Sequence, residues 1–385
     1  MPSTDPHGAA KAAPPVPAAA GPDPAVLQLR AVHRAIADLR RGTPVLLDGA
    51  ERLLVLAAET VGARGLAELA ALATVPPVLL LAPVRAAAVL RRPIGQDTGA
   101  VALALPPALL SADRLRSLAD PTAEEMLPAD PPAAIAPPAG AAAALALSKL
   151  CHLLPAVLAA PAARPALVAA QGLITVPAAA VLAYPDAMAA RLTRVAEAEV
   201  PLADAPDARV VAFRGPDAGI EHLAILVGRP EQAASPLARI HSQCFTGDLL
   251  GSLRCDCGAQ LRGAIRRMAE DGAGVLLYLA QEGGGIGLPN KLRAYALQDG
   301  GLDTVDANRA LGWEADERRF LIAATMLQEL GIAGVRLLTN NPDKVAALAA
   351  CGIAVVREPH AFAPNGVNDR YLATKAARFG HLLGG

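Results

Sequence analysis

The spacing of apolar residues predicts helices and strands that alternate along the first half of the chain. Val32, Ile36 and Leu39 fall on one face of a predicted helix over residues 27–41, which Gly42 ends. The other predicted elements of this half are strands at 44–47, 78–81 and 101–105 and Ala-rich helices at 65–73 and 140–154. Strands that alternate with helices indicate α/β or α+β architecture.

The pattern changes after residue 188, where charged and polar residues become frequent and fall at predicted turns. Apolar runs predict strands at 210–213, 222–227, 274–279, 335–338 and 353–356. Amphipathic segments predict helices at 260–271, 290–299, 318–330 and 342–350. This half is again typical of an α/β domain, with functional residues expected in the connecting loops.

Length and composition support two globular domains. At 385 residues the chain exceeds what one hydrophobic core usually organises. We expect a disordered tail over residues 1–25, a first domain over 26–188 and a second over 189–385. The clearest internal loop is 121–138, which holds six prolines. The expected fold class is therefore α/β (α+β), with two mixed-sheet domains.

Charge and hydropathy exclude some function classes. Apolar residues make up 53 % of the chain and the net charge is −1, without the basic excess of a protein that grips nucleic acid. The most apolar stretch, residues 153–184, is broken by Arg164, Gln171 and four prolines, so we expect no membrane span. Residues 1–23 lack a charged start followed by an apolar segment, so we expect no secretory signal and a cytoplasmic location.

Three of the five cysteines fall in the pattern Cys244-x10-Cys255-x-Cys257. In a chain with no predicted export signal, this crowding favours a metal site or catalysis over a disulfide framework. Three thiolates with a fourth position left to water would form a catalytic zinc site, and soft ligands favour zinc over magnesium or calcium. The spacing leaves two alternatives open: buried reduced cysteines, or a four-ligand structural site completed by His241.

A Gly-rich segment, residues 281–288, is a second candidate for function. Glycines let backbone amides approach a ligand closely, and Glu282 could pair with a guanine-type N–H edge. The alternative is an ordinary glycine turn.

Two predicted helix starts are candidates for phosphate binding. In Ala315-Asp-Glu-Arg318 the acidic residues are typical helix caps, but the arginine could meet a phosphate. Leu338-Thr-Asn-Asn-Pro-Asp-Lys344 turns from a strand end into a helix N-terminus, with Lys344 as a point charge. Its alternative is a plain Asn-Pro helix start.

Together these segments resemble GTP cyclohydrolase II, in the same order and with matching intervals, from Arg194 to the C-terminal Gly380-His-Leu-Leu. The words that carry the resemblance are His241-Ser-x-Cys-x-Thr-Gly-Asp, Ser252-Leu-Arg-Cys-Asp-Cys-Gly258, Asn290-Lys-x-Arg-Ala-Tyr-Ala-Leu-Gln-Asp299 and Leu338-Thr-Asn-Asn-Pro. Agreement over so many specific words excludes chance.

The resemblance implies roles for individual residues. Cys244, Cys255 and Cys257 would hold zinc. Asp316 matches the family's proton acceptor, Arg318 its proposed nucleophile toward the α-phosphate, and Tyr295 the tyrosine that positions the ring for hydrolysis. The residues expected to contact GTP are Arg239, Ile240, His241, Ser242, Gln243, Gln260, Glu282, Gly283, Gly284, Thr304, Thr339 and Lys344. Among these, Glu282 would read the guanine edge, while Thr304, Thr339 and Lys344 would contact ribose or phosphates.

The implied reaction is the zinc-dependent hydrolysis of GTP that begins riboflavin biosynthesis. A zinc-activated hydroxide would attack C8 of guanine, the imidazole ring would open, and C8 would leave as formate. Cleavage between the α- and β-phosphates would release pyrophosphate, with Mg²⁺ shielding the triphosphate. The product would be 2,5-diamino-6-ribosylamino-4(3H)-pyrimidinone 5′-phosphate. GTP is the expected small-molecule partner, and a homodimer is the family expectation.

Three positions depart from the family pattern. Gly284 stands where the family usually has arginine, which removes a phosphate contact; Gln243 replaces a frequent glutamate, and Asp343 replaces a commonly basic residue. Two other functions therefore stay open. One is a paralogue that gives a formamidopyrimidine product or acts in pyrimidine catabolism, and the other is a non-catalytic GTP-binding regulator.

The first domain resembles 3,4-dihydroxy-2-butanone-4-phosphate synthase diffusely, over residues 28–185. Residues 34–61 look like the opening of that enzyme, and Ser111-Ala-Asp-Arg114 matches a later word. The acidic metal-binding loop has shrunk to Asp48-Gly-Ala-Glu51, and no histidine occurs between His33 and His152. Metal catalysis needs its hard oxygen ligands. We interpret the carboxylates of this segment, including Glu59, as surface or capping groups, and predict a non-catalytic domain retained for folding, dimerisation or regulation.

Overall fold

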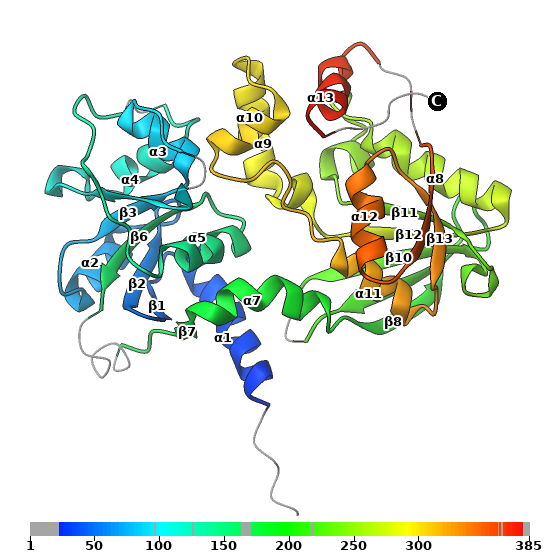
Figure 1. Ribbon diagram of the computed structural model, residues 1–385, viewed down its shortest axis with the longest axis horizontal. Helices are drawn as coiled ribbons and strands as arrows, with labels where there is room; N and C mark the ends of the chain where they lie inside the picture. Colours follow the sequence, from blue (N-terminus) through cyan, green and yellow to red (C-terminus); the bar gives the residue numbers. More distant parts are fainter. Residues whose placement is uncertain are drawn as a thin grey trace, which may run out of the picture.

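The structure is a computed structural model that describes residues 23–95, 98–124, 127–162, 171–216, 219–360, 362 and 365–379. The predicted tail up to residue 22 and the C-terminal residues 380–385 lie outside these ranges. Two seven-stranded sheets form the two domains, and helix α7 (Ala178–Ala189) runs between them (Figure 1). Both sheets mix parallel and antiparallel strands, which confirms the predicted fold class.

The N-terminal sheet has the order β5-β4-β3-β6-β2-β1-β7. All its neighbouring strands are antiparallel except β1 and β7, which are parallel. The strands are β1 (Val45–Asp48), β2 (Arg52–Ala57), β3 (Val78–Leu81), β4 (Val101–Ala104), β5 (Ala134–Ile135), β6 (Ala156–Pro161) and β7 (Thr175–Pro177).

Five further helices complete the N-terminal domain: α1 (Pro24–Arg40), α2 (Ala63–Leu72), α3 (Pro83–Leu90), α4 (Ala112–Ala119) and α5 (Ala141–Leu150). Helix α1 begins at Pro24, inside the span predicted as a tail. Asp23 caps this helix by accepting a hydrogen bond from the Ala25 amide, and a proline fits the first helical position because its missing N–H would be unpaired there.

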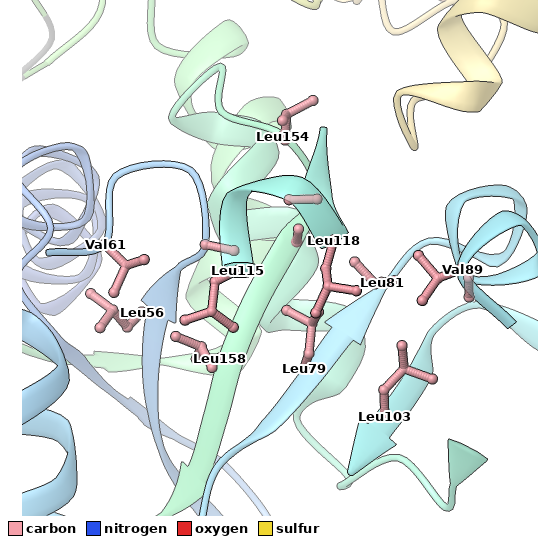
Figure 2. Packing of buried hydrophobic residues seen from close by; sticks show 14 of the residues in the cluster. Leu56, Val61, Leu79, Leu81, Val89, Leu103, Leu115, Leu118, Leu154 and Leu158 are labelled. Atoms are coloured by element: carbon pink, nitrogen blue, oxygen red, sulfur yellow. The ribbon is translucent and has the colours of Figure 1, made fainter. Parts of the chain in front are cut away.

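The N-terminal sheet is buried on both faces. Along β2, Leu54 and Leu56 belong to one core cluster, while Leu53 and Val55 belong to another on the opposite face. Figure 2 shows the first cluster, where side chains of β2, β3 and β6 meet those of α4. A strand covered on both faces appears in the sequence as a continuous apolar run, which explains the composition of this half.

The C-terminal sheet has the order β14-β13-β11-β12-β10-β9-β8. Its strands β11 to β14 are parallel, and β8, β9 and β10 add antiparallel neighbours. The strands are β8 (Thr193–Glu199), β9 (Arg209–Arg214), β10 (Glu221–Gly228), β11 (Leu237–Ser242), β12 (Ala273–Leu279), β13 (Gly334–Leu338) and β14 (Ala354–Glu358). The helices are α8 (Cys257–Asp271), α9 (Leu288–Asp299), α10 (Thr304–Ala310), α11 (Leu321–Glu329), α12 (Pro342–Ala350) and α13 (Asp369–Phe379).

Most predicted elements of this half match the structure, with one difference that concerns function. The helix predicted from residue 318 begins at Leu321, so the Asp316–Arg318 segment is a loop and its acidic residues do not cap that helix. Strands β8 and β11 were not predicted. Every residue of β8 is exposed, which removes the apolar alternation that marks a strand.

One hydrophobic cluster crosses the domain boundary. Ile286, Leu311 and Trp313 of the second half belong to the same cluster as Leu154 and Leu158 of the first. Helices α9 and α10 lie between the two sheets in Figure 1. Within the described ranges, none of the helices combines the length and the apolar character needed to cross a bilayer.

The core of the second domain gives a first prediction. Phe213 on β9 is fully buried, so Phe213→Ala leaves a cavity and should lower the free energy of unfolding by about 3–5 kcal/mol. Leu182→Ala, at a side chain 55 % exposed, should change it by less than about 0.5 kcal/mol. The measurement is the urea midpoint by circular dichroism. Equal shifts for the two variants would contradict the core assignment.

Candidate active site

The candidate site lies at the carboxyl ends of the parallel strands β11, β12 and β13, where ligands bind in open α/β sheets. The residues that follow these strands, Gln243, Gln281 and Thr339, enter the loops that surround a pocket. Every residue predicted to bind metal or GTP or to act in catalysis lines this pocket, except Glu282. The structure therefore brings together segments that lie up to about a hundred residues apart.

The three cysteines form a cluster at the floor of this pocket. Their Sγ atoms all lie within 4.8 Å of one another, and those of Cys244 and Cys255 are 3.7 Å apart. Cys257 is the first residue of helix α8, where the helix dipole favours a thiolate. Hydrogen bonds with Cys255 and Cys257, and a further one from Lys291, hold the pKa of Cys244 well below its ordinary value.

The cluster fits a tetrahedral metal with three sulfur ligands. Zinc–sulfur bonds of about 2.3 Å at tetrahedral angles place two sulfurs about 3.8 Å apart, which the Cys244–Cys255 pair matches. Gly247 cradles the cluster: a Cβ atom there would lie 2.8 Å from Cys255 Sγ and 3.0 Å from Cys244 Sγ. Its amide donates to Cys244 Sγ at 3.3 Å. Only a glycine permits this approach of backbone to thiols.

His241 does not complete a four-ligand site. Its Nε2 lies 3.0 Å from Asp248 Oδ1, and its ring stacks on Tyr278. In the described part of the chain, the only group of metal-ligating side chains close enough to share an ion is the cysteine trio. The geometry therefore favours three protein ligands with an open fourth position over a closed structural site.

Lys291 is a site residue to which the sequence analysis assigned no role. From helix α9 its Nζ donates to Cys244 Sγ and Thr246 Oγ1, both at 3.0 Å, and to Glu282 Oε1 at 2.9 Å. Burial lowers the pKa of Lys291, but its bonds to Cys244 and Glu282 outweigh burial and raise it above the ordinary value. Lysine is one of the residues of the α9 motif, but the sequence shows no sign that it meets a cysteine 47 positions earlier.

Glu282 lies beside the pocket and not in its lining. Its carboxylate accepts hydrogen bonds from Lys291 and from the Phe245 and Gly283 amides, the Phe245 bond being 2.6 Å long. A guanine edge would have to compete with these donors, so the structure does not place Glu282 for the role that the resemblance implies.

Three basic side chains are buried along the pocket. Arg239 and Lys344 are each 6 % exposed, and Arg318 lies beside them in the lining. Burial lowers the pKa of Arg239 to about 10. Burial, followed by the charges of Arg318 and Arg239, lowers the pKa of Lys344 well below its ordinary value. Such a concentration of cations is costly without an anion, so the pocket is built for a negatively charged ligand.

Several buried polar atoms of the pocket point to the same conclusion. Within the described residues, no hydrogen-bond partner is found for Arg239 Nε, His241 Nδ1, Ser242 Oγ and Asn341 Nδ2. Asn341 caps helix α12 with its Oδ1, which accepts from the Asp343 amide at 2.8 Å, so its Nδ2 is left to donate elsewhere. Buried groups of this kind normally have partners, and a bound ligand would supply them.

Asp316 and Arg318 form a pair inside the pocket. Arg318 Nε donates to Asp316 Oδ1 at 2.7 Å, and the second guanidinium nitrogen bonds Oδ2. Burial raises the pKa of Asp316, but these bonds outweigh it and hold the pKa below its ordinary value. Burial lowers the pKa of Arg318, and the bond to Asp316 reverses this, so its pKa is raised. Both groups are therefore charged at neutral pH.

Tyr295 stands one helical turn beyond Lys291 on α9. Its hydroxyl lies 3.5 Å from Thr246 Oγ1, and the Arg254 guanidinium sits 5.0 Å from its ring centroid. Thr304, the first residue of α10, accepts from Gln298 Nε2 at 3.5 Å at the edge of the pocket.

The Gly-rich segment forms a tight turn at the pocket wall. Gly283, Gly284, Gly285 and Gly287 all have left-handed backbone conformations, with φ between 65° and 100°. At Gly284 an added Cβ would meet no atom within 4 Å, so there is space for a side chain, but its φ of 76° strains any residue other than glycine.

A thiol cluster with an open side, next to a buried cationic pocket, defines a candidate metal centre for a phosphorylated substrate. Comparison with known proteins agrees. A sequence model described as GTP cyclohydrolase II matches residues 193–359. A GTP cyclohydrolase-2 from Azospirillum brasilense is 49 % identical over 368 residues, covering 92 % of this chain and 94 % of that protein. The chain therefore belongs to the GTP cyclohydrolase II family.

Two other comparisons concern the domains separately. A GTP cyclohydrolase-2 from Yersinia pestis is 53 % identical over 194 residues, which cover 50 % of this chain and 98 % of that protein. A solved two-domain 3,4-dihydroxy-2-butanone 4-phosphate synthase from A. baumannii is 16 % identical and covers 85 % of this chain and 99 % of its own, at a TM-score of 0.31. At that score the likeness carries no argument about the fold, so the N-terminal resemblance stays a prediction.

The cradle around the cysteines gives the second prediction. Gly247→Ala places a methyl group against two sulfurs and should weaken metal binding about 10–100-fold while the fold is retained. Gly62→Ala, where an added Cβ meets nothing within 4 Å, is the control. The measurement is metal content by atomic emission after dialysis against a graded chelator. Unchanged metal retention in Gly247→Ala would show that the cysteines do not hold the metal together.

Proposed function

We propose that the chain hydrolyses GTP in a zinc-dependent reaction, opening the guanine imidazole ring and releasing formate and pyrophosphate. The product is 2,5-diamino-6-ribosylamino-4(3H)-pyrimidinone 5′-phosphate, which begins riboflavin biosynthesis. The observation that carries this proposal is the position of the Cys244, Cys255 and Cys257 cluster inside a pocket lined by buried cations. Family membership supplies the substrate.

The pocket residues divide into two chemical groups. Zinc held by the three thiolates supplies Lewis acidity at its open coordination position. Arg239, Lys344 and the free Nδ2 of Asn341 offer donors to phosphate oxygens. Thr304 and Thr339 lie in the same lining and contact the ribose or phosphates. Mg²⁺ binds with the triphosphate, whose charge it partly neutralises.

Asp316 serves as the proton acceptor in this proposal because its lowered pKa keeps it ionised at neutral pH. The nucleophilic role that the resemblance implies for Arg318 requires a neutral guanidine, and the raised pKa of Arg318 opposes the loss of its proton. The geometry favours Arg318 as a charged donor to the α-phosphate, with Asp316 holding its orientation. Tyr295 lies near the cysteines and positions the ring.

The N-terminal domain is non-catalytic in this proposal. Asp48 pairs with Arg52 across the β1–β2 hairpin, at 3.0 Å and largely exposed, and no cluster of carboxylates suited to a metal occurs among its described residues. A homodimer and a cytoplasmic location remain predictions from the family resemblance.

The third prediction concerns the products. Purified protein incubated with GTP and Mg²⁺ should give formate, pyrophosphate and the diaminopyrimidine, identified by mass. Zinc chelation or Cys255→Ser should abolish all three, because the metal loses a ligand.

Two outcomes would replace this proposal. A formylated intermediate as the final product would identify the formamidopyrimidine-forming paralogue. GTP binding without turnover by folded, zinc-loaded protein would favour the non-catalytic regulator.

The fourth prediction concerns the phosphate end of the pocket. Lys344→Met removes a buried charge and should raise KM for GTP about 10–100-fold, the loss of one charge-assisted hydrogen bond. Arg266→Met is the control, because Arg266 pairs with Asp204 on the surface away from the pocket lining. Steady-state kinetics measure the effect. An unchanged KM in Lys344→Met would remove this residue from the substrate contacts.

A further inference from the structure

We propose that the N-terminal domain positions the catalytic side of the pocket, and that Arg293 on helix α9 is the positioning residue through which it acts. Glu59 and Asp120 of the N-terminal domain hold Arg293, and this sets Lys291 and Tyr295 against the cysteine cluster. The activity readout rests on the proposed function.

Arg293 is held by acceptors from both domains. Its Nε donates to Asp120 Oδ2 at 2.8 Å, one terminal nitrogen to Glu59 Oε1 at 2.9 Å, and the other to Asn290 Oδ1 at 2.8 Å. The side chain of Arg293 is 21 % exposed and those of both carboxylates are 16 % exposed, so the pairing is largely withdrawn from solvent. A planar guanidinium with its donors committed in three directions fixes orientation as well as distance.

Each carboxylate is itself anchored in the N-terminal domain. Glu59 Oε2 accepts from the Leu154 amide at 2.7 Å, and Asp120 Oδ1 accepts from the Thr122 amide at 2.8 Å. The interpretation of Glu59 as a surface or capping group was therefore wrong, because its carboxylate bridges its own domain to α9. These anchors make the two acceptors a rigid receptor for Arg293.

Helix α9 connects this receptor to the reaction site. Asn290 and Arg293 bond the N-terminal domain, while Lys291 and Tyr295, on a different face of the same helix, reach the pocket. A rotation or shift of α9 therefore moves the Lys291 ammonium away from Cys244 Sγ. The cysteines belong to β11 and α8 and do not themselves hold α9 in place.

Two further contacts support the same side of the pocket. The turn after α5 presents the His152 carbonyl to Asn290 Nδ2 at 2.9 Å, with His152 in a left-handed conformation (φ 55°) that a histidine seldom adopts. Lys149 at the end of α5 bonds Glu317 Oε1 at 2.6 Å, directly next to Asp316. The N-terminal domain thus contacts both catalytic segments of the second domain.

The test compares Arg293→Met and Glu59→Gln in the full chain. Each should lower kcat about 10–100-fold with little change in KM, because displaced catalytic groups cost rate and the phosphate contacts lie elsewhere. Bound zinc should stay at wild-type levels. The double variant should lose no more than the worse single variant, because both changes break one interaction. Arg293→Lys, which keeps the charge and one donor, should recover part of the rate.

Arg209→Met is the matched control. Arg209 bonds Glu197 and Glu231 at 2.6 and 2.9 Å, is 15 % exposed, and lies outside the pocket lining. It should lower thermal stability as Arg293→Met does while leaving kcat unchanged. If Arg293→Met lowers stability alone, with wild-type kcat, the residue only joins the domains and the proposal is overturned.

Hydrogen exchange separates this proposal from the proposed function. Amides of α9 should exchange at least about tenfold faster in Arg293→Met and Glu59→Gln than in Arg209→Met, whether or not the protein turns over GTP. Wild-type protection of α9 in both variants would overturn the positioning role. Loss of turnover in the unmodified chain, with these exchange differences present, would contradict the proposed function only.

Discussion

The approach of three thiols to one glycine is the constraint on which the site depends. Cys244 follows strand β11, while Cys255 and Cys257 lead into helix α8, and the backbone of Gly247 fills the space between their sulfurs. Any side chain at that position would separate the ligands. The start of α8 and the ends of the parallel strands meet at the same place, so the metal centre and the anion pocket are consequences of one local packing arrangement.

The pocket is organised for its ligand at the expense of its own stability. Arg239, Arg318 and Lys344 converge in a space where Asp316 offers a single balancing carboxylate from the lining. Their shifted pKa values and the unpaired donors nearby express the same conflict, since cations brought out of water repel one another and lack acceptors. Proteins tolerate such conflict where a substrate resolves it.

The sequence predicted what local patterns encode. Helix α12 spans the predicted residues 342–350, because Asn341 and Pro342 form a recognisable helix start. The cysteine trio was predicted from its spacing and its motif. Strand β8 was missed because it is exposed throughout, and Lys291 because its partner Cys244 belongs to another element. The misinterpretation of Glu59 has the same cause, since its partner lies 234 positions further along the chain and no local pattern reports it.

The shared hydrophobic cluster also bears on how this protein can be divided. Ile286, Leu311 and Trp313 are almost fully buried, and they share their cluster with leucines of the N-terminal sheet. A chain cut after helix α7 would present these side chains to water as one apolar surface beside the catalytic pocket. Such a fragment would be prone to self-association, so its low solubility would reflect the missing neighbour and not a failure of its own sheet to fold.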